Sequence, residues 1–167
     1  MKLTMVLVLF GTFYLTFDTS LVHFYGFTFR KFNMSPYLTL LGIALIFIII
    51  GSFFGDLQSY YPRYKIIHGT SFAAHHQVPT WVSVFIYETT YATSFITVEF
   101  IFRGFLIYAF VKYFGPYSIL PMVATYCFLH FGKPATETLS SIFGGYVLGI
   151  FALKNKNIWG GVMVHVG

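Results

Sequence analysis

An apolar run near the middle of the chain contains one acidic and one basic residue, Glu99 and Arg103. Because they are four residues apart, a helix places both on one face, with the acid before the base in the favourable order. A charge in membrane hydrocarbon costs at least about 2.5 to 3.5 kcal/mol, so the two must pair or face a polar cavity. The pair therefore predicts either a functional site inside a membrane or a structural ion pair between helices.

Two histidines that follow, His130 and His165, each lie in a separate apolar segment. Tyr126 precedes His130 by four residues, so a helix lets the phenol and the imidazole share a hydrogen-bond network. His130 is expected at a helix C-terminus, where the helix dipole favours a proton on the imidazole.

Two further acids, Glu88 and Glu137, are candidates for supporting roles. Glu88 lies 11 residues before Glu99, close to three helical turns, so both carboxylates are expected to face the same interior, unless Glu88 is an interfacial acid near a helix start. Glu137 follows a break at Gly132 to Pro134, and we expect it in the first turn of a new helix, where an acid complements the dipole.

Glu99, His130 and His165 thus bring one ionisable group from each of three predicted helices. A carboxylate in a dry cavity can act as general base on a water molecule, while imidazoles either hold a metal or donate to a developing oxyanion. Arg103 would hold Glu99 ionised and oriented. Water activated in this way attacks an acyl carbon, so amide hydrolysis is the predicted reaction class.

The composition predicts an integral membrane protein. Hydrophobic residues make up 57% of the chain and charged residues 9%, against about 45 to 50% and about 25% in soluble domains. The fold class we predict is an all-α polytopic transmembrane bundle of about six or seven helices, the last one truncated at Gly167. The net charge of +5 comes mostly from basic residues at the ends of apolar runs, which predicts contact with the lipid bilayer and argues against nucleic acid.

We expect the chain to divide into an N-terminal part, residues 1–79, with transmembrane helices and a polar interfacial loop, and a catalytic core, residues 80–167, that is incomplete at its C-terminus. An interfacial connection is expected from Asp18 to Ser35, and a polar excursion too rich in turn residues to cross a membrane from Leu57 to Pro79. Helices are expected at Leu3–Phe17, Tyr37–Gly55, Thr80–Tyr113, Tyr117–Phe131, Leu139–Leu153 and from Ile158 onward.

Three segments, in this order, resemble the motifs of the CPBP family of intramembrane proteases. They are Glu99-Phe-Ile-Phe-Arg103-Gly104, Tyr126-x-x-x-His130, and Ile158-Trp159 leading to His165. The family includes the CAAX prenyl proteases and bacteriocin-processing or self-immunity proteins. The resemblance covers roughly residues 80 to 167 and implies that Glu99 activates water and Arg103 supports it. It also implies that His130 and His165 are ligands of a divalent metal such as zinc, or stabilisers of the transition state.

The first motif departs from the family pattern at one position. The family reads Glu-Glu-x-x-x-Arg, so Val98 stands where the first glutamate is found, and that glutamate is the one usually credited with activating water. Glu99 is the next residue, and Glu88 or Glu137 could compensate. The polar partner of the third motif would lie four residues after His165, beyond Gly167.

The predicted function is that of an intramembrane endopeptidase, a glutamate-dependent metalloprotease of the bacterial cytoplasmic membrane. It would hydrolyse a peptide bond at or near the membrane surface in a peptide or protein substrate, either a lipidated protein or a leader peptide. One alternative is a catalytically inactive immunity or scaffold protein that binds or shields a peptide. The other is a small proton-coupled transporter in which Glu99, Arg103 and the two histidines relay protons.

Overall fold

The computed structural model describes residues 2–17 and 24–166, and within these ranges the chain is helical without any strand. The predicted all-α fold class is therefore confirmed. Of the interfacial connection expected from Asp18 to Ser35, residues 18 to 23 lie outside the described residues. The elements are α1 (Lys2–Phe17), η1 (Phe24–Gly26), α2 (Ser35–Gly51), α3 (Gly55–Tyr60), α4 (Arg63–Ile66), α5 (Gly69–His75), α6 (Thr80–Glu99), η2 (Phe100–Leu106), α7 (Ile107–Phe114), η3 (Gly115–Ser118), α8 (Ile119–Phe128), α9 (Ala135–Asn155) and α10 (Trp159–Val166).

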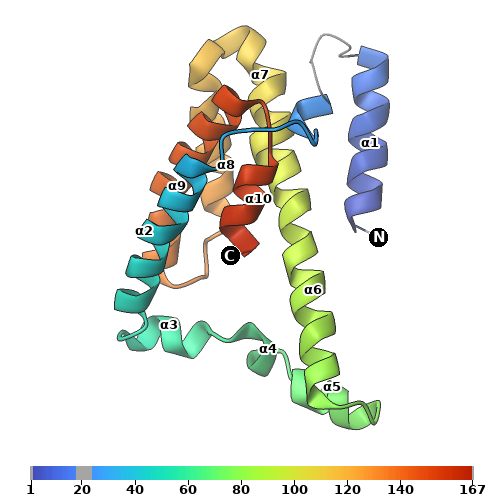
Figure 1. Cartoon of the computed structure of the whole chain (residues 1–167), viewed down its shortest axis with the longest axis vertical. Helices are drawn as coiled ribbons and strands as arrows, with labels where there is room; N and C mark the ends of the chain where they lie inside the picture. Colours follow the sequence, from blue (N-terminus) through green and yellow to red (C-terminus); the bar gives the residue numbers. More distant parts are fainter. Residues whose placement is uncertain (1, 18–23, 167) are drawn as a thin grey trace.

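The central element is the continuous helical stretch α6–η2–α7, around which the other helices are arranged (Figure 1). It begins after Pro79, whose fixed φ suits a helix start. Its middle segment η2 is π-helical and starts directly after Glu99; such wider turns are frequent at functional sites. At Gly115 the backbone takes φ 54° and ψ −140°, so the stretch ends between the predicted helices Thr80–Tyr113 and Tyr117–Phe131. Helix α8 then packs against α9.

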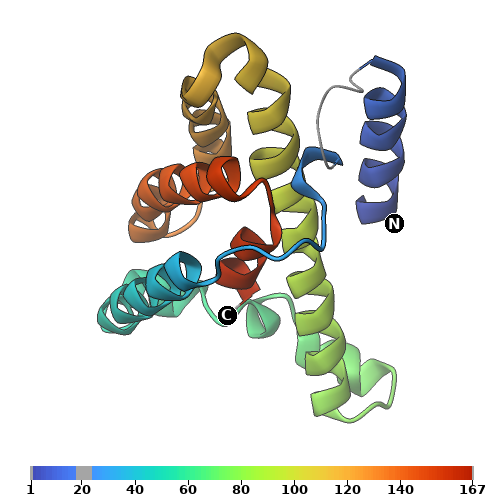
Figure 2. The same ribbon diagram turned by 45° about the horizontal axis from the view of Figure 1, so that its top comes forward.

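Helices α8, α9 and α10 complete the bundle on one side of α6 (Figure 2). A Cβ built on Gly149 of α9 would lie 2.7 Å from the methyl carbon of Met122 in α8, so glycine permits the close approach of these two helices. Helix α9 begins at Ala135, four residues before the predicted apolar span Leu139–Leu153, and Glu137 lies in its first turn as expected. Helix α10 packs against α6, α2 and α9.

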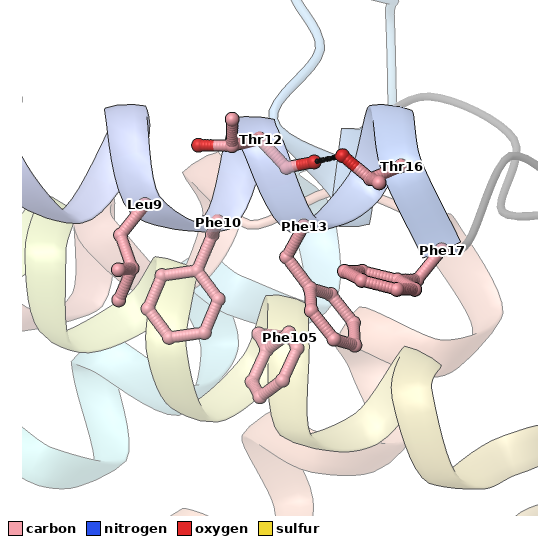
Figure 3. A pocket seen from close by; sticks show the side chains of 7 residues that line it. All are labelled: Leu9, Phe10, Thr12, Phe13, Thr16, Phe17 and Phe105. Atoms are coloured by element: carbon pink, nitrogen blue, oxygen red, sulfur yellow. Dashed lines mark hydrogen bonds between the residues drawn. The ribbon is translucent and has the colours of Figure 1, made fainter.

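Helix α1 lies on the side of α6 away from α2 and α9 in both views (Figures 1 and 2). Its Phe10 and Phe13 rings approach the Phe105 ring of η2, with centroids 4.3 and 5.9 Å apart. Figure 3 shows these side chains pointing toward Phe105. They line a hollow that is almost entirely apolar, and it contains none of the residues predicted to do chemistry.

Several helices carry apolar residues on all sides. Along α2, Phe47 is 70% exposed and Ile46 59% exposed, although exposed apolar surface in water is unfavourable by about 25 cal/mol per Å². By length and composition, two helical stretches within the described residues could cross a membrane: Thr80–Phe128, which includes the turn at Gly115, and Ala135–Asn155. Leu3–Phe17 and Ser35–Gly51 are shorter apolar helices. This pattern is the one expected for a chain that contacts hydrocarbon.

The polar connection, which we define as residues 52–79, contains the short helices α3, α4 and α5 and lies across one end of the bundle between α2 and α6 (Figure 1). The sequence predicts that Leu57 to Pro79, which form most of this segment, do not cross a membrane. Its short helices, separated by turns, agree with that prediction.

Candidate active site

Glu99 and Arg103 form the predicted ion pair at the junction of α6 and η2. Both residues have 0% relative exposure, and Nη1 of Arg103 lies 3.1 Å from Oε1 of Glu99. A single buried charge here would be strongly unfavourable, whereas the pair neutralises itself within one helical turn. The guanidinium thus holds the carboxylate in its ionised form.

His165 approaches the same carboxylate from α10. Its Nδ1 lies 3.1 Å from Oε1 of Glu99 and 3.1 Å from the carbonyl oxygen of Gly161. Both neighbours are acceptors, so Nδ1 carries the hydrogen, and in the neutral form of the imidazole Nε2 then carries the lone pair. The ring of Phe95 in α6 stacks on the imidazole of His165, with ring centroids 5.1 Å apart and planes inclined by 20°. The imidazole is therefore fixed in both its position and its tautomer.

Tyr126 of α8 connects His165 with Arg103. Its hydroxyl lies 2.8 Å from Nε2 of His165, and the tautomer assigned above makes the hydroxyl the donor. Its ring lies under the guanidinium of Arg103, with the central carbon 3.9 Å from the ring centroid, the arrangement of a cation–π contact. Tyr126, His165 and Glu99 thus form a hydrogen-bonding chain from α8 through α10 to α6.

His130 is buried in the turn after α8 and joins this cluster through Tyr126. Its Nδ1 lies 3.1 Å from the carbonyl oxygen of Tyr126, and the two ring centroids are 4.6 Å apart, so the predicted shared face is present. The expectation that the helix dipole favours protonation is wrong: burial, and then the Lys133 charge, lower the pKa of His130. With a hydrogen on Nδ1 toward the carbonyl, Nε2 of the neutral ring carries a lone pair.

Gly161 forms the floor beneath the carboxylate of Glu99. A Cβ built on this glycine would lie 1.9 Å from Oε2 of Glu99, which no real side chain can occupy. Oε2 itself is buried and has no hydrogen-bond partner among the described residues. A buried carboxylate oxygen without a partner is unusual and requires an explanation, such as a catalytic role.

Glu88 and Glu137 do not contact the Glu99 carboxylate. Glu88 is exposed while Glu99 is fully buried, so the expectation of a shared interior is wrong. Eleven residues separate them by about 16 Å along a helix, so the two carboxylates lie about three turns apart. The carboxylate of Glu137 instead accepts hydrogen bonds from Nζ of Lys133 and from the hydroxyl of Tyr61.

Sequence reasoning missed several residues that build the site. Gly161 and Phe95 lie among many other glycines and aromatics, and nothing in their local pattern distinguishes them. Asn157 had a usable signal, because an asparagine two residues before Trp159 is a typical helix cap. Its Oδ1 accepts from the backbone N–H of Trp159 at 2.7 Å, which fixes the start of the helix that carries His165.

The predicted metal at His130 and His165 finds a poor fit in this arrangement. Both ring nitrogens of His165 are engaged, Nδ1 toward Glu99 and Gly161 and Nε2 toward Tyr126. A metal ligand has to present a free lone pair. In the two described ranges, no group of three or more His, Cys, Asp or Glu side chains is placed to hold a metal ion. The metal stays a prediction.

Comparison with known families decides the wider identity of the chain. Residues 80–167, more than half of the sequence, match the profile of the type II CAAX prenyl endopeptidase Rce1-like family. The chain belongs to this family. The match confirms the resemblance to CPBP intramembrane proteases. No curated protein and no solved structure matches the chain.

Membership in the Rce1-like family carries two general conclusions. Its members are integral membrane proteases, and they act on peptide substrates at a membrane. The residues that resemble the family's three motifs are those that the structure brings together: Glu99 with Arg103, Tyr126 with His130, and His165. This favours a hydrolase over the proton-coupled transporter.

Proposed function

We propose that this protein is an intramembrane endopeptidase in which Glu99 is the general base that activates water. One observation carries the proposal: Glu99 is fully buried, contacts Arg103 and His165 through Oε1, and has no hydrogen-bond partner for Oε2 among the described residues. Oε2 therefore retains the lone pairs that can accept a proton.

The reaction balances with this single carboxylate. Glu99 takes a proton from water as the water oxygen forms a bond to the carbonyl carbon of the scissile peptide. The protonated Glu99 then gives the proton to the leaving nitrogen as the carbon–nitrogen bond breaks. The products are a carboxylic acid and an amine, and Glu99 returns to its ionised form. A positioned acid and base of this kind typically contributes about 10² to 10⁴-fold to the rate.

Arg103 and His165 would orient the base rather than touch the peptide. The guanidinium keeps Glu99 ionised before the reaction, and Nδ1–H of His165 fixes the orientation of the carboxylate. Tyr126 holds Nε2 of His165 and stacks under Arg103, so it links the two supports. Preorganised groups of this kind avoid reorganisation during the reaction, which is the main source of electrostatic catalysis.

His130 has a different role in this proposal. Its neutral ring presents the Nε2 lone pair, because Nδ1 is held by the Tyr126 carbonyl. Nε2 can accept a hydrogen bond from the attacking water and so orient the water toward the peptide carbon. A divalent metal at the same nitrogen is the second way in which His130 could serve, and it remains a prediction.

The proposed substrate is a peptide segment presented at or near the membrane surface. A lipidated protein and a leader peptide are the two substrate classes to test, and the bacterial cytoplasmic membrane is the proposed location. Both classes bring an apolar anchor into the bilayer, which would concentrate the scissile bond close to a membrane-embedded site.

Replacing Glu99 by Gln tests the assignment. The amide keeps the shape but cannot accept a proton, so cleavage of a fluorogenic membrane-associated peptide should fall by at least about 10²-fold. Glu88→Gln is the matched control, because Glu88 is exposed and lies away from the cluster, and it should leave the rate unchanged. Undiminished cleavage by the Glu99 variant would remove Glu99 from the mechanism.

A second candidate function is a family member that binds a peptide without cleaving it. Val98 favours it, because this residue stands at the position of the first glutamate in the family motif and packs against the hydrophobic core. Such a protein would bind the same peptide with equal affinity whether residue 99 is Glu or Gln, and neither form would release product.

A further inference from the structure

The polar connection contacts the start of α9 at two points. The hydroxyl of Tyr61 donates to Oε2 of Glu137 at 2.8 Å. Oδ2 of Asp56 accepts from the backbone N–H of Ala135 at 3.1 Å. Tyr61 and Asp56 precede the family-matched residues 80–167, whereas Ala135 and Glu137 are within them. A segment without family motifs thus holds part of the region that carries them.

Helix α9 depends on this outside support at its first turn. The residue before it, Pro134, makes no side-chain cap, and the first backbone N–H groups of any helix lack partners within the helix. The Asp56 carboxylate supplies one acceptor and also complements the helix dipole. The first turn of α9 is therefore stabilised by the polar connection.

Glu137 is held on both of its carboxylate oxygens. Oε1 accepts from Nζ of Lys133 at 2.6 Å, and Oε2 accepts from Tyr61. Burial, and next the contact with Glu137, raise the pKa of Tyr61 well above its ordinary value, so its hydroxyl remains a donor at neutral pH. The Glu137 side chain is consequently fixed rather than free to rotate.

The residues on either side of Glu137 hold the backbone of His130. The carbonyl oxygen of His130 accepts from Oγ1 of Thr138 at 2.7 Å and from the backbone N–H of Lys133 at 3.1 Å. A shift of the first turn of α9 would therefore displace Lys133 and Thr138 together, and with them the turn that carries the imidazole of His130.

We propose that Tyr61 is a positioning residue for His130, acting through Glu137 and the first turn of α9. The inference rests on the proposed function, in which His130 orients the attacking water. Tyr61 does not touch the reacting atoms in this scheme. Its effect is on the geometry of the turn between α8 and α9, so it should alter the catalytic step and leave the capture of peptide unchanged.

Tyr61→Phe removes the hydroxyl and keeps the ring. We expect kcat to fall roughly tenfold with KM unchanged, less than the roughly 10²-fold that a 1 Å misplacement can cost. Tyr60→Phe is the matched control, because it removes the hydroxyl of the adjacent tyrosine, whose ring packs under Arg63. In a Glu137→Ala background, Tyr61→Phe should have no further effect. Equal losses in both backgrounds would show that Tyr61 does not act through Glu137.

A spectroscopic readout separates this inference from the proposed function. In protein labelled with ¹⁵N-histidine and held in lipid nanodiscs, with His130 assigned by a His130→Gln variant, Tyr61→Phe should shift the ring nitrogens of His130, and Tyr60→Phe should not. If the wild-type protein cleaves no peptide, the proposed function fails and this shift still decides the positioning role. If cleavage is observed but the His130 signals do not move, the positioning role is wrong and the protease proposal is unaffected.

Discussion

Gly161→Ala gives the sharpest test of the site geometry, because this glycine lies directly beneath the carboxylate of Glu99. A Cβ at this position would lie 1.9 Å from Oε2. Ordinary van der Waals contact begins at 3.4 Å, so the carboxylate or α10 must move by about 1.5 Å. Both partners are packed, since Glu99 and Gly161 are buried.

The size of the effect follows from that displacement. A misplacement of about 1 Å can cost about 10²-fold in rate, equivalent to about 2.7 kcal/mol of transition-state stabilisation. Overpacking a core by one carbon costs about 1 to 3 kcal/mol of stability. We therefore expect Gly161→Ala to lower kcat by about 10²-fold while the protein still folds, because Glu99 loses its alignment with Arg103 and His165.

The assay combines peptide cleavage with thermal unfolding in the same detergent. Gly144→Ala is the matched control: it is the same change, and a Cβ built on this α9 glycine has no neighbour within 4 Å. It should leave both the rate and the melting temperature close to those of the wild-type protein. Glu99→Asp, which shortens the carboxylate side chain by one carbon, supplies the second background.

Combining Gly161→Ala with Glu99→Asp tests whether the methyl group acts on the carboxylate. If the methyl group acts by displacing the carboxylate, Gly161→Ala should cost distinctly less in Glu99→Asp than in the wild-type protein, since the shorter side chain leaves room. Strictly additive losses would mean that the alanine perturbs α10 without acting on Glu99. A full wild-type rate for Gly161→Ala alone would refute the geometry of the site.

Two further predictions concern Arg103 and His130. Arg103→Lys keeps the charge but loses the planar stacking over Tyr126, so it should destabilise the protein by about 2 kcal/mol; Arg63→Lys, which loses a more exposed stack over Tyr60, should cost at most about 1 kcal/mol, as measured by thermal unfolding. Because burial lowers the pKa of His130, the unfolded chain binds a proton below about pH 6.5 that the folded chain resists. Melting temperature should therefore fall as the pH drops below about 6.5, and His130→Gln should flatten that dependence; an identical slope in the variant would contradict the pKa assignment.

The main features of the fold follow from the sequence. The apolar runs are long, and the interruptions at Gly115-Pro116 and Gly132 to Pro134 are strong breakers, so helix existence and order are well determined. Helix boundaries are less well determined by the sequence. Helix α9 starts at Ala135, but its first residues are polar, so the apolar pattern that marks the helix begins only later. The polar connection could also be predicted only in part. Its tyrosines and charges indicate a segment that does not cross a membrane, but they do not reveal where it packs.

The site itself could be predicted only in part. The four-residue spacings that bring Glu99 to Arg103 and Tyr126 to His130 are local, and helix geometry fixes them. Contacts between helices are not encoded in spacing: neither the approach of His165 to Glu99 nor the place of Gly161 beneath the carboxylate can be read from one chain. For Glu88, the spacing predicted a shared interior that is absent. Helical phase shows which residues lie on the same side of a helix, but it does not show which turns another helix covers.

The neighbouring residues Val98 and Glu99 explain how one carboxylate can serve where the family motif has two. Successive residues on a helix point to different faces, and here Glu99 faces Arg103 and His165 while Val98 packs against the buried aromatic cluster that includes Tyr25 and Phe100. A carboxylate at position 98 would enter this apolar layer without a cation beside it, which is costly. The apolar side chain of Val98 therefore occupies that face. On the polar face, the charges of Glu99 and Arg103 balance each other. This is why the mechanism we propose places the general base at Glu99.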